Sequence, residues 1–144
     1  MTQEKQNAVN AIEEKAGLIG DVADHIWEYA ELSLQEVKSA ALYCEVLEKE
    51  GFQVEKGISG IETAFSASYG QGRPMIGFLA EYDALSGLSQ EGGSLEKKEL
   101  TAGGCGHGCG HNLLGAGAMA AALGVKACLL YTLRAHETVL DLVC

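Results

Sequence analysis

Basic side chains are scarce in this chain. Ten lysines and arginines stand against twenty aspartates and glutamates, so the formal net charge at pH 7 is −10. An excess of negative charge disfavours binding to nucleic acid or to an anionic membrane surface. We therefore expect no nucleic-acid partner and no membrane partner, and we attribute the charge to solubility in preference to a specific cationic partner.

Targeting signals are also lacking. Residues 1–30 contain no basic start followed by an apolar run, so no secretory signal is visible. No stretch reaches the ~20 apolar residues expected of a membrane span. The chain has five cysteines, an odd number, which suggests free thiols in a reducing compartment. We expect a cytoplasmic protein.

Hydrophobic periodicity predicts one α/β domain. A capping box, Ser33-x-x-Glu36, predicts where the second helix opens, and Gly51 predicts where it stops. Cys44 lies on the apolar face of that helix and is expected to be buried. The predicted elements, in order, are a helix over 4–30, a helix over 33–50, a strand over 61–69, a strand over 75–80 buried on both faces, a long loop over 83–109 and a small-residue helix over 111–126.

The run GGCGHGCGHN (103–112) concentrates metal-binding residue types. It places Cys105, His107, Cys109 and His111 at alternate positions with glycine between them. Thiolate and imidazole suit borderline-soft divalent metals, and glycine lets the backbone bend so that neighbouring ligands face one ion. The pattern favours a metal site over the alternative, a flexible loop in which these residues are incidental.

Closed four-ligand zinc sites usually draw on two separated ligand pairs, and this chain has no second pair. We prefer an open site of the catalytic type, in which two ligands come from this loop and the remaining ligands come from elsewhere in the chain. His136-Glu137 does not start a zincin motif, because Leu140 stands where the second histidine belongs. The string GAGAMA (115–120) lies within a predicted helix, so we reject it as a dinucleotide fingerprint.

Two carboxylates follow the predicted buried strand. Glu81 and Asp83 stand where this strand leads into the loop that carries the Cys/His run, and ligands of α/β sheets bind beyond the carboxyl ends of strands. They are either part of a site or solvated loop charges, and the spacing alone does not decide between these.

Two segments together resemble a known family. FLAEYDALSGLS (78–89) and GHGCGHNLLGAGAMAAALGVK (106–126) resemble the p-aminobenzoyl-glutamate utilisation protein B group, within the aminoacylase/carboxypeptidase superfamily of metal-dependent amidohydrolases. The resemblance covers about residues 1–126. It implies the N-terminal part of a zinc-peptidase-like catalytic domain, with helices flanking a mixed sheet. It also implies a small-molecule amide substrate, zinc or manganese as cofactor, and a dimerisation domain that this chain lacks.

The resemblance also implies residue roles. Cys109 and His111 match the family's first two metal ligands, and Asp83 matches the catalytic-site carboxylate that orients or supports a ligand. Glu81 occupies a place where many superfamily members have a ligand histidine. His107 recurs in the group, whereas Cys105 is an individual feature.

After Lys126 the resemblance stops, so we divide the chain into a partial catalytic domain (1–126) and a non-matching tail (127–144). Relatives continue into a Glu-Glu segment that supplies the general base and a further ligand, and no such pair occurs in the tail. A frameshift, a truncated gene or a split enzyme are the open explanations. Two functions also remain open: an amidohydrolase by descent that is inactive as this chain, or a non-catalytic metal-binding module. We expect the tail to pack poorly, as a helical continuation on the surface.

Overall fold

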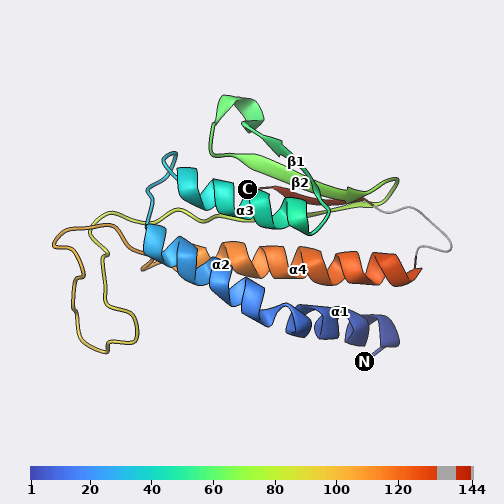
Figure 1. Cartoon of the computed structure of the whole chain (residues 1–144), viewed down its shortest axis with the longest axis horizontal. Helices are drawn as coiled ribbons and strands as arrows, with labels where there is room; N and C mark the ends of the chain where they lie inside the picture. Colours follow the sequence, from blue (N-terminus) through green and yellow to red (C-terminus); the bar gives the residue numbers. More distant parts are fainter. Residues whose placement is uncertain (133–138, 144) are drawn as a thin grey trace.

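The computed structural model describes residues 1–132 and 139–143 (Figure 1). Its elements are α1 (Gln3–Glu14), α2 (Ala16–Tyr29), α3 (Val37–Lys49), β1 (Gln53–Lys56), the 3-10 turn η1 (Ile58–Gly60), β2 (Phe65–Gly70), β3 (Met75–Leu79), α4 (His111–Thr132) and β4 (Val139–Val143).

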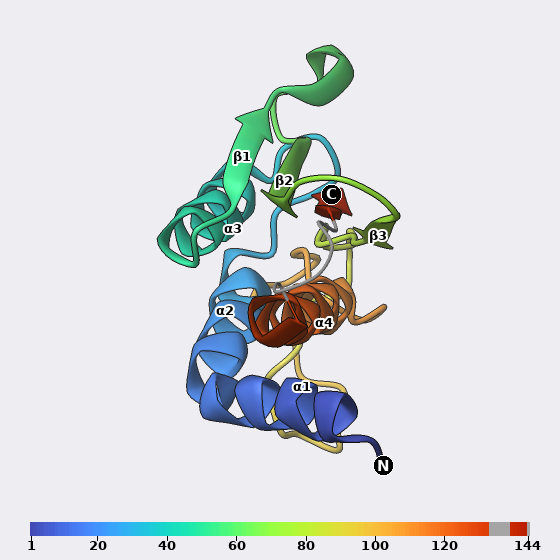
Figure 2. The ribbon, with the colours of Figure 1, turned by 90° about the vertical axis from the view of Figure 1, so that its right-hand side faces the viewer.

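The four strands form one mixed sheet in the order β1-β2-β4-β3. The β1–β2 and β2–β4 pairs are antiparallel, whereas β3 and β4 are parallel. Helix α3 packs against β1 and β2, α4 packs against β3 and β4, and α1 and α2 lie on the far side of α4 (Figure 2). The predicted α/β class with a mixed sheet is confirmed, with the described helices gathered on one face of the sheet.

The core lies between the sheet and the helices that cover it. Three rings from different elements meet there, those of Tyr43 on α3, Phe65 on β2 and Tyr82 after β3, with centroids 5.3–6.2 Å apart. Ile26 of α2 and Met119 of α4 are fully buried beside this cluster. This packing fixes the segment after β3 against the helices, and the candidate site lies on that segment.

The predicted helix over 4–30 is two helices. The α-helical pattern is interrupted at Lys15, whose backbone N–H donates to the carbonyl of Ile12, three residues earlier, at 3.1 Å. Because α1 and α2 both pack along α4, this interruption lets the pair follow one neighbouring helix.

The predicted capping box on α3 is wrong. Glu36 occupies the N-cap position but makes no side-chain cap bond. Instead, the Glu31 carboxylate accepts the backbone N–H groups of Lys38 and Ser39 at 3.0 and 2.9 Å, and the Ser39 hydroxyl at 2.8 Å. The end of the helix before Gly51, which has a φ of +84°, is confirmed.

The two central strand predictions hold only in part. The strand expected over 61–69 begins only at Phe65, and β1 was not predicted. Strand β3 is not buried on both faces, since Met75 and Leu79 are 59% and 76% exposed. Of the described strands only β4 pairs with β3, so the apolar run lies at an edge of the sheet (Figure 2).

The expected helical continuation after Lys126 is confirmed as far as Thr132, but the expected poor packing is wrong for the described residues, since Leu129 is buried. Helix α4 continues to Thr132, and β4 lies between β2 and β3, paired on both sides. The interior position follows because β2 and β3 each present an edge that β4 can bond. His136 and Glu137 lie outside the described residues, and the division at Lys126 stays a prediction.

Helix α4 meets the length and composition of a membrane span over His111–Leu129. In this fold it packs against α1, α2 and the sheet. A core helix passes the same test of length and composition, so the helix does not change our expectation about a membrane.

Candidate metal centre

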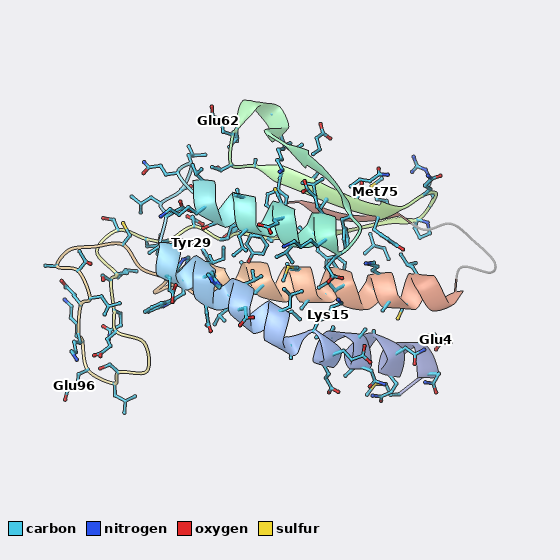
Figure 3. All side chains as sticks on the ribbon, viewed as in Figure 1. Glu4, Lys15, Tyr29, Glu62, Met75 and Glu96 are labelled. Atoms are coloured by element: carbon cyan, nitrogen blue, oxygen red, sulfur yellow. The ribbon has the colours of Figure 1, made fainter. Side chains whose placement is uncertain are left out.

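Backbone hydrogen bonds hold the carboxylate segment against the connection between α2 and α3 on one side and against the Cys/His loop on the other. The N–H of Ala84 donates to the carbonyl of Glu31 at 2.7 Å, which ties the segment after β3 to the start of the α3 region. Leu85 and Gly106 exchange both backbone hydrogen bonds, at 2.9 and 3.0 Å. The loop over 80–110 extends far from the sheet, with Glu96 near its tip (Figure 3), yet its two ends stay side by side.

Glycine allows two close approaches in this arrangement. A Cβ on Gly106 would collide with the backbone of Leu88, and a Cβ on Gly115 would collide with the Tyr43 hydroxyl and lie 3.0 Å from the Glu81 carbonyl oxygen. Gly115 belongs to the string 115–120, so here glycine serves helix packing and not phosphate binding.

His111 lies at the centre of a three-residue group. Its Nδ1 lies 2.8 Å from Asp83 Oδ1, and its Nε2 lies 3.3 Å from Glu81 Oε2. One ligand atom from each of these side chains lies within 4.8 Å of the others. If Nδ1 carries the proton and donates it to Asp83, Nε2 presents a lone pair towards Glu81. This is the arrangement of a metal-binding histidine oriented by a carboxylate.

The predicted site residues are brought together only in part. Asp83 and His111 meet, but Cys109 is exposed and does not belong to the three-residue group. Cys109 precedes α4 by one glycine, Gly110, whose φ of +80° turns the chain. Its ligation of a metal stays a prediction. Glu81, for which direct ligation was not predicted, is the carboxylate next to His111 Nε2.

His107 has a separate environment. Its Nε2 lies 3.0 Å from the backbone carbonyl of Ile26 on α2, and its Nδ1 is buried without a hydrogen-bond partner among the described residues. Burial lowers the pKa of the His107 imidazole, against the opposing effect of the Ile26 carbonyl. His107 therefore fastens the loop to α2, and with Cys105 it lines a cavity of about 550 Å³ beside Trp27.

The three-residue group opens into a different cavity of about 400 Å³. Glu36 lines this cavity as well and is only 7% exposed. Sequence reasoning assigned Glu36 to a helix cap and so missed its place in the site. The signal was its position directly before α3 and in line with the buried stripe of that helix, four residues before Ala40 and seven before Tyr43.

The three-residue group has the geometry to hold a divalent metal, and comparison with known proteins gives the family. No family model matches the chain. The chain is 48% identical over 117 residues to a subunit of the p-aminobenzoyl-glutamate hydrolase of Escherichia coli, covering 81% of this chain and 24% of that protein. It is 30% identical over 135 residues to the mouse Xaa-Arg dipeptidase, covering 87% and 27%. The chain thus spans about a quarter of these relatives.

Solved structures agree with this relationship. The Bacillus subtilis YXEP protein, a dinuclear metal-binding peptidase of the M20 family, matches with a TM-score of 0.63 and 25% identity, over 91% of this chain and 35% of that one. An aminohydrolase from methicillin-resistant Staphylococcus aureus matches with a TM-score of 0.72 and 20% identity, over 96% and 34%, which shows the fold alone. The chain belongs to the same family as the p-aminobenzoyl-glutamate hydrolase subunit, and its fold matches that of a peptidase of the M20 family.

Proposed function

We propose that this chain supplies one side of the metal centre of an amidohydrolase. The reaction would be hydrolysis of the amide bond of N-acyl amino acids, p-aminobenzoyl-glutamate or small peptides. The observation that carries the proposal is the 2.8 Å contact between His111 Nδ1 and Asp83 Oδ1 in a chain of this family. Of two relatives, one name contains a glutamate conjugate and the other an arginine dipeptide, so the relatives do not fix the charge of the substrate.

The residues present fit a divalent metal. One imidazole nitrogen and the Glu81 carboxylate face each other, and both atom types bind zinc and manganese. His111 would hold the ion through Nε2, with Glu81 beside it and Cys109 as the predicted thiolate ligand. A bound ion acts as a Lewis acid towards the amide carbonyl. The part of Asp83 is to hold the Nδ1 proton, which keeps the His111 ring in the tautomer that leaves Nε2 free.

We further propose that these 144 residues alone do not hydrolyse amides. No Glu-Glu pair follows Lys126, and such a pair supplies the general base in the family that the chain resembles. Loss of a general base alone typically costs about 10²–10⁴-fold in rate. Activity would then need a base and further ligands from another polypeptide segment. We also propose a cytoplasmic location, which the free thiols of Cys44, Cys105 and Cys109 support.

Metal titration tests the proposal directly. Zinc and manganese affinities are measured by calorimetry for the unmodified chain and for the double variant Cys109→Ala, His111→Ala. We expect the double variant to lose the binding. His25→Ala, which removes an exposed histidine of α2, is the matched control and should bind as the unmodified chain does. Unchanged affinity in the double variant would contradict the proposal.

The non-catalytic metal-binding module makes a different prediction for the same assay. A module that uses only Cys105, His107, Cys109 and His111 has no need of Asp83. The variants Cys105→Ala and His107→Ala would then weaken binding while Asp83→Asn would not. The opposite result supports the interpretation as a catalytic domain.

A further inference from the structure

One carboxylate in the cavity of the metal centre has no partner among the described residues. Glu36 Oε2 is buried and makes no hydrogen bond to any of them, and no described lysine, arginine or histidine forms an ion pair with Glu36. A buried carboxylate without compensation is costly, because it has left water without gaining an opposite charge or a donor. The cost is removed when a cation or a strong hydrogen-bond donor enters the cavity beside it.

The remaining lining of the cavity shows which ligand would fit. It contains the hydroxyl-bearing side chains of Ser33 and Thr63, and none of the described residues that line it is a lysine or arginine. Glu36 is not part of the Glu81, Asp83 and His111 group, so it lacks the neighbouring donors that a second metal ion would need. A single buried carboxylate with hydroxyls nearby suits an organic cation instead, either a guanidinium or an ammonium group.

Apolar side chains also line this cavity. Leu34 and Ile61 line it and are 69% and 42% exposed. Leu34 also has a φ of +65°, a left-handed conformation that is uncommon for a residue with this side chain. Exposed apolar side chains next to a buried carboxylate match a ligand with an aliphatic stem and a cationic end, because such a stem packs on apolar surface while its head group pairs with charge.

We propose that Glu36 is a specificity-determining residue that binds the cationic side chain of an arginine-like or lysine-like substrate residue, with Leu34 and Ile61 against its stem. This inference rests on the proposed function, since it places substrate in the cavity of the metal centre. It assigns to Glu36 a part in recognition and none in binding the metal.

Two ligands of nearly equal shape but different charge test whether Glu36 binds a cationic side chain. N-acetyl-arginine amide carries the guanidinium, and N-acetyl-citrulline amide replaces it with a neutral urea. Affinities are measured by calorimetry on the full chain with a chelator present, so that the readout does not depend on metal. We expect the arginine derivative to bind about tenfold or more tightly than the citrulline derivative, the size typical of a hydrogen bond to a charged group. Alanine amide, which offers only an α-ammonium group, should bind no better than the citrulline derivative.

Three variants locate the effect. Glu36→Gln keeps the shape and removes the charge, so the preference for arginine should disappear. Glu55→Gln removes an exposed carboxylate of β1 and should leave the preference intact. Glu81→Gln reports whether the guanidinium sits on the metal group instead. An unchanged circular dichroism spectrum for Glu36→Gln confirms that the variant folds.

The outcomes separate this inference from the proposed function. Equal binding of the two amides, no binding of either, or a preference that survives Glu36→Gln or is lost in Glu81→Gln alone overturns the role of Glu36. Zinc affinity of Glu36→Gln should equal that of the unmodified chain, because Glu36 lies outside the metal group. Failure of the proposed function would instead appear as zinc binding that does not depend on Cys109 and His111.

Discussion

Replacing Asp83 by asparagine tests the orientation of His111 most directly. The asparagine keeps the size of the side chain and an oxygen that can accept from Nδ1, but it removes the negative charge 2.8 Å from that nitrogen. The His111 and Asp83 side chains are 18% and 22% exposed, so water screens their contact only in part. Loss of such a supporting carboxylate typically costs 10–100-fold in metal affinity, or about 1.4–2.7 kcal/mol.

The assay is a competitive zinc titration of the Asp83→Asn chain at constant pH. Asp24→Asn, which removes an exposed carboxylate of α2, controls for the change of one unit in net charge. We expect Asp83→Asn to bind zinc at least tenfold more weakly than this control. Equal affinities of the two variants would refute the reasoning, since Asp83 would then make no difference to the ligand that it contacts.

Three further predictions concern the thiols, the core and the tail. Burial raises the pKa of the Cys44 thiol, so iodoacetamide should label exposed Cys109 first and Cys44 last, as followed by mass spectrometry. Because the Cys44 thiol ionises at a lower pH in the unfolded chain than in the folded chain, the free energy of unfolding should fall as the pH rises past about 8.5, the ordinary pKa of a cysteine. Phe65→Ala removes a buried ring and should cost about 3–5 kcal/mol of unfolding free energy in urea titrations. Leu79→Lys changes an exposed residue of the edge strand, so it should cost about 0.5 kcal/mol or less and should reduce the light scattering caused by association. Ending the chain after residue 132 should lower the thermal midpoint, because β2 and β3 lose the strand that both bond; an unchanged midpoint would mean that residues 139–143 add nothing to the sheet.

The helices could be predicted because the spacing of apolar residues within each segment shows which side of the helix is buried. The apolar stripe of α3 fixes which side of the helix is buried, and the buried Cys44 follows from it. Helix ends depend partly on contacts from farther away. The donors at the start of α3 are satisfied by Glu31, which comes from outside the helix and takes the place expected of Ser33.

Strand burial cannot be predicted in the same way. The apolar run of β3 is typical of a strand covered on both faces, but its exposure depends on which strands and helices lie beside it. For the same reason β4 could not be foreseen. Its position follows from the free edges of β2 and β3, which are set by the rest of the sheet and not by the sequence of residues 139–143.

The site shows the same division. The approach of Asp83 to His111 could be predicted, because a strand end and the start of the following helix meet at the carboxyl edge of a sheet. The position of Cys109 outside the group depends on the course of a glycine-rich loop, which residue types alone do not determine.

The contrast between two carboxylates in one cavity points to what the cavity binds. Asp83 is partly buried, and the imidazole of His111 satisfies it within the chain. Glu36 is more deeply buried and has nothing comparable among the described residues. A group that only served folding would be expected to have a partner in the folded chain, as Asp83 does, because burial without one lowers stability. In our proposal, the free energy lost by burying Glu36 is recovered when the cationic side chain of a substrate binds beside it in the cavity shared with His111.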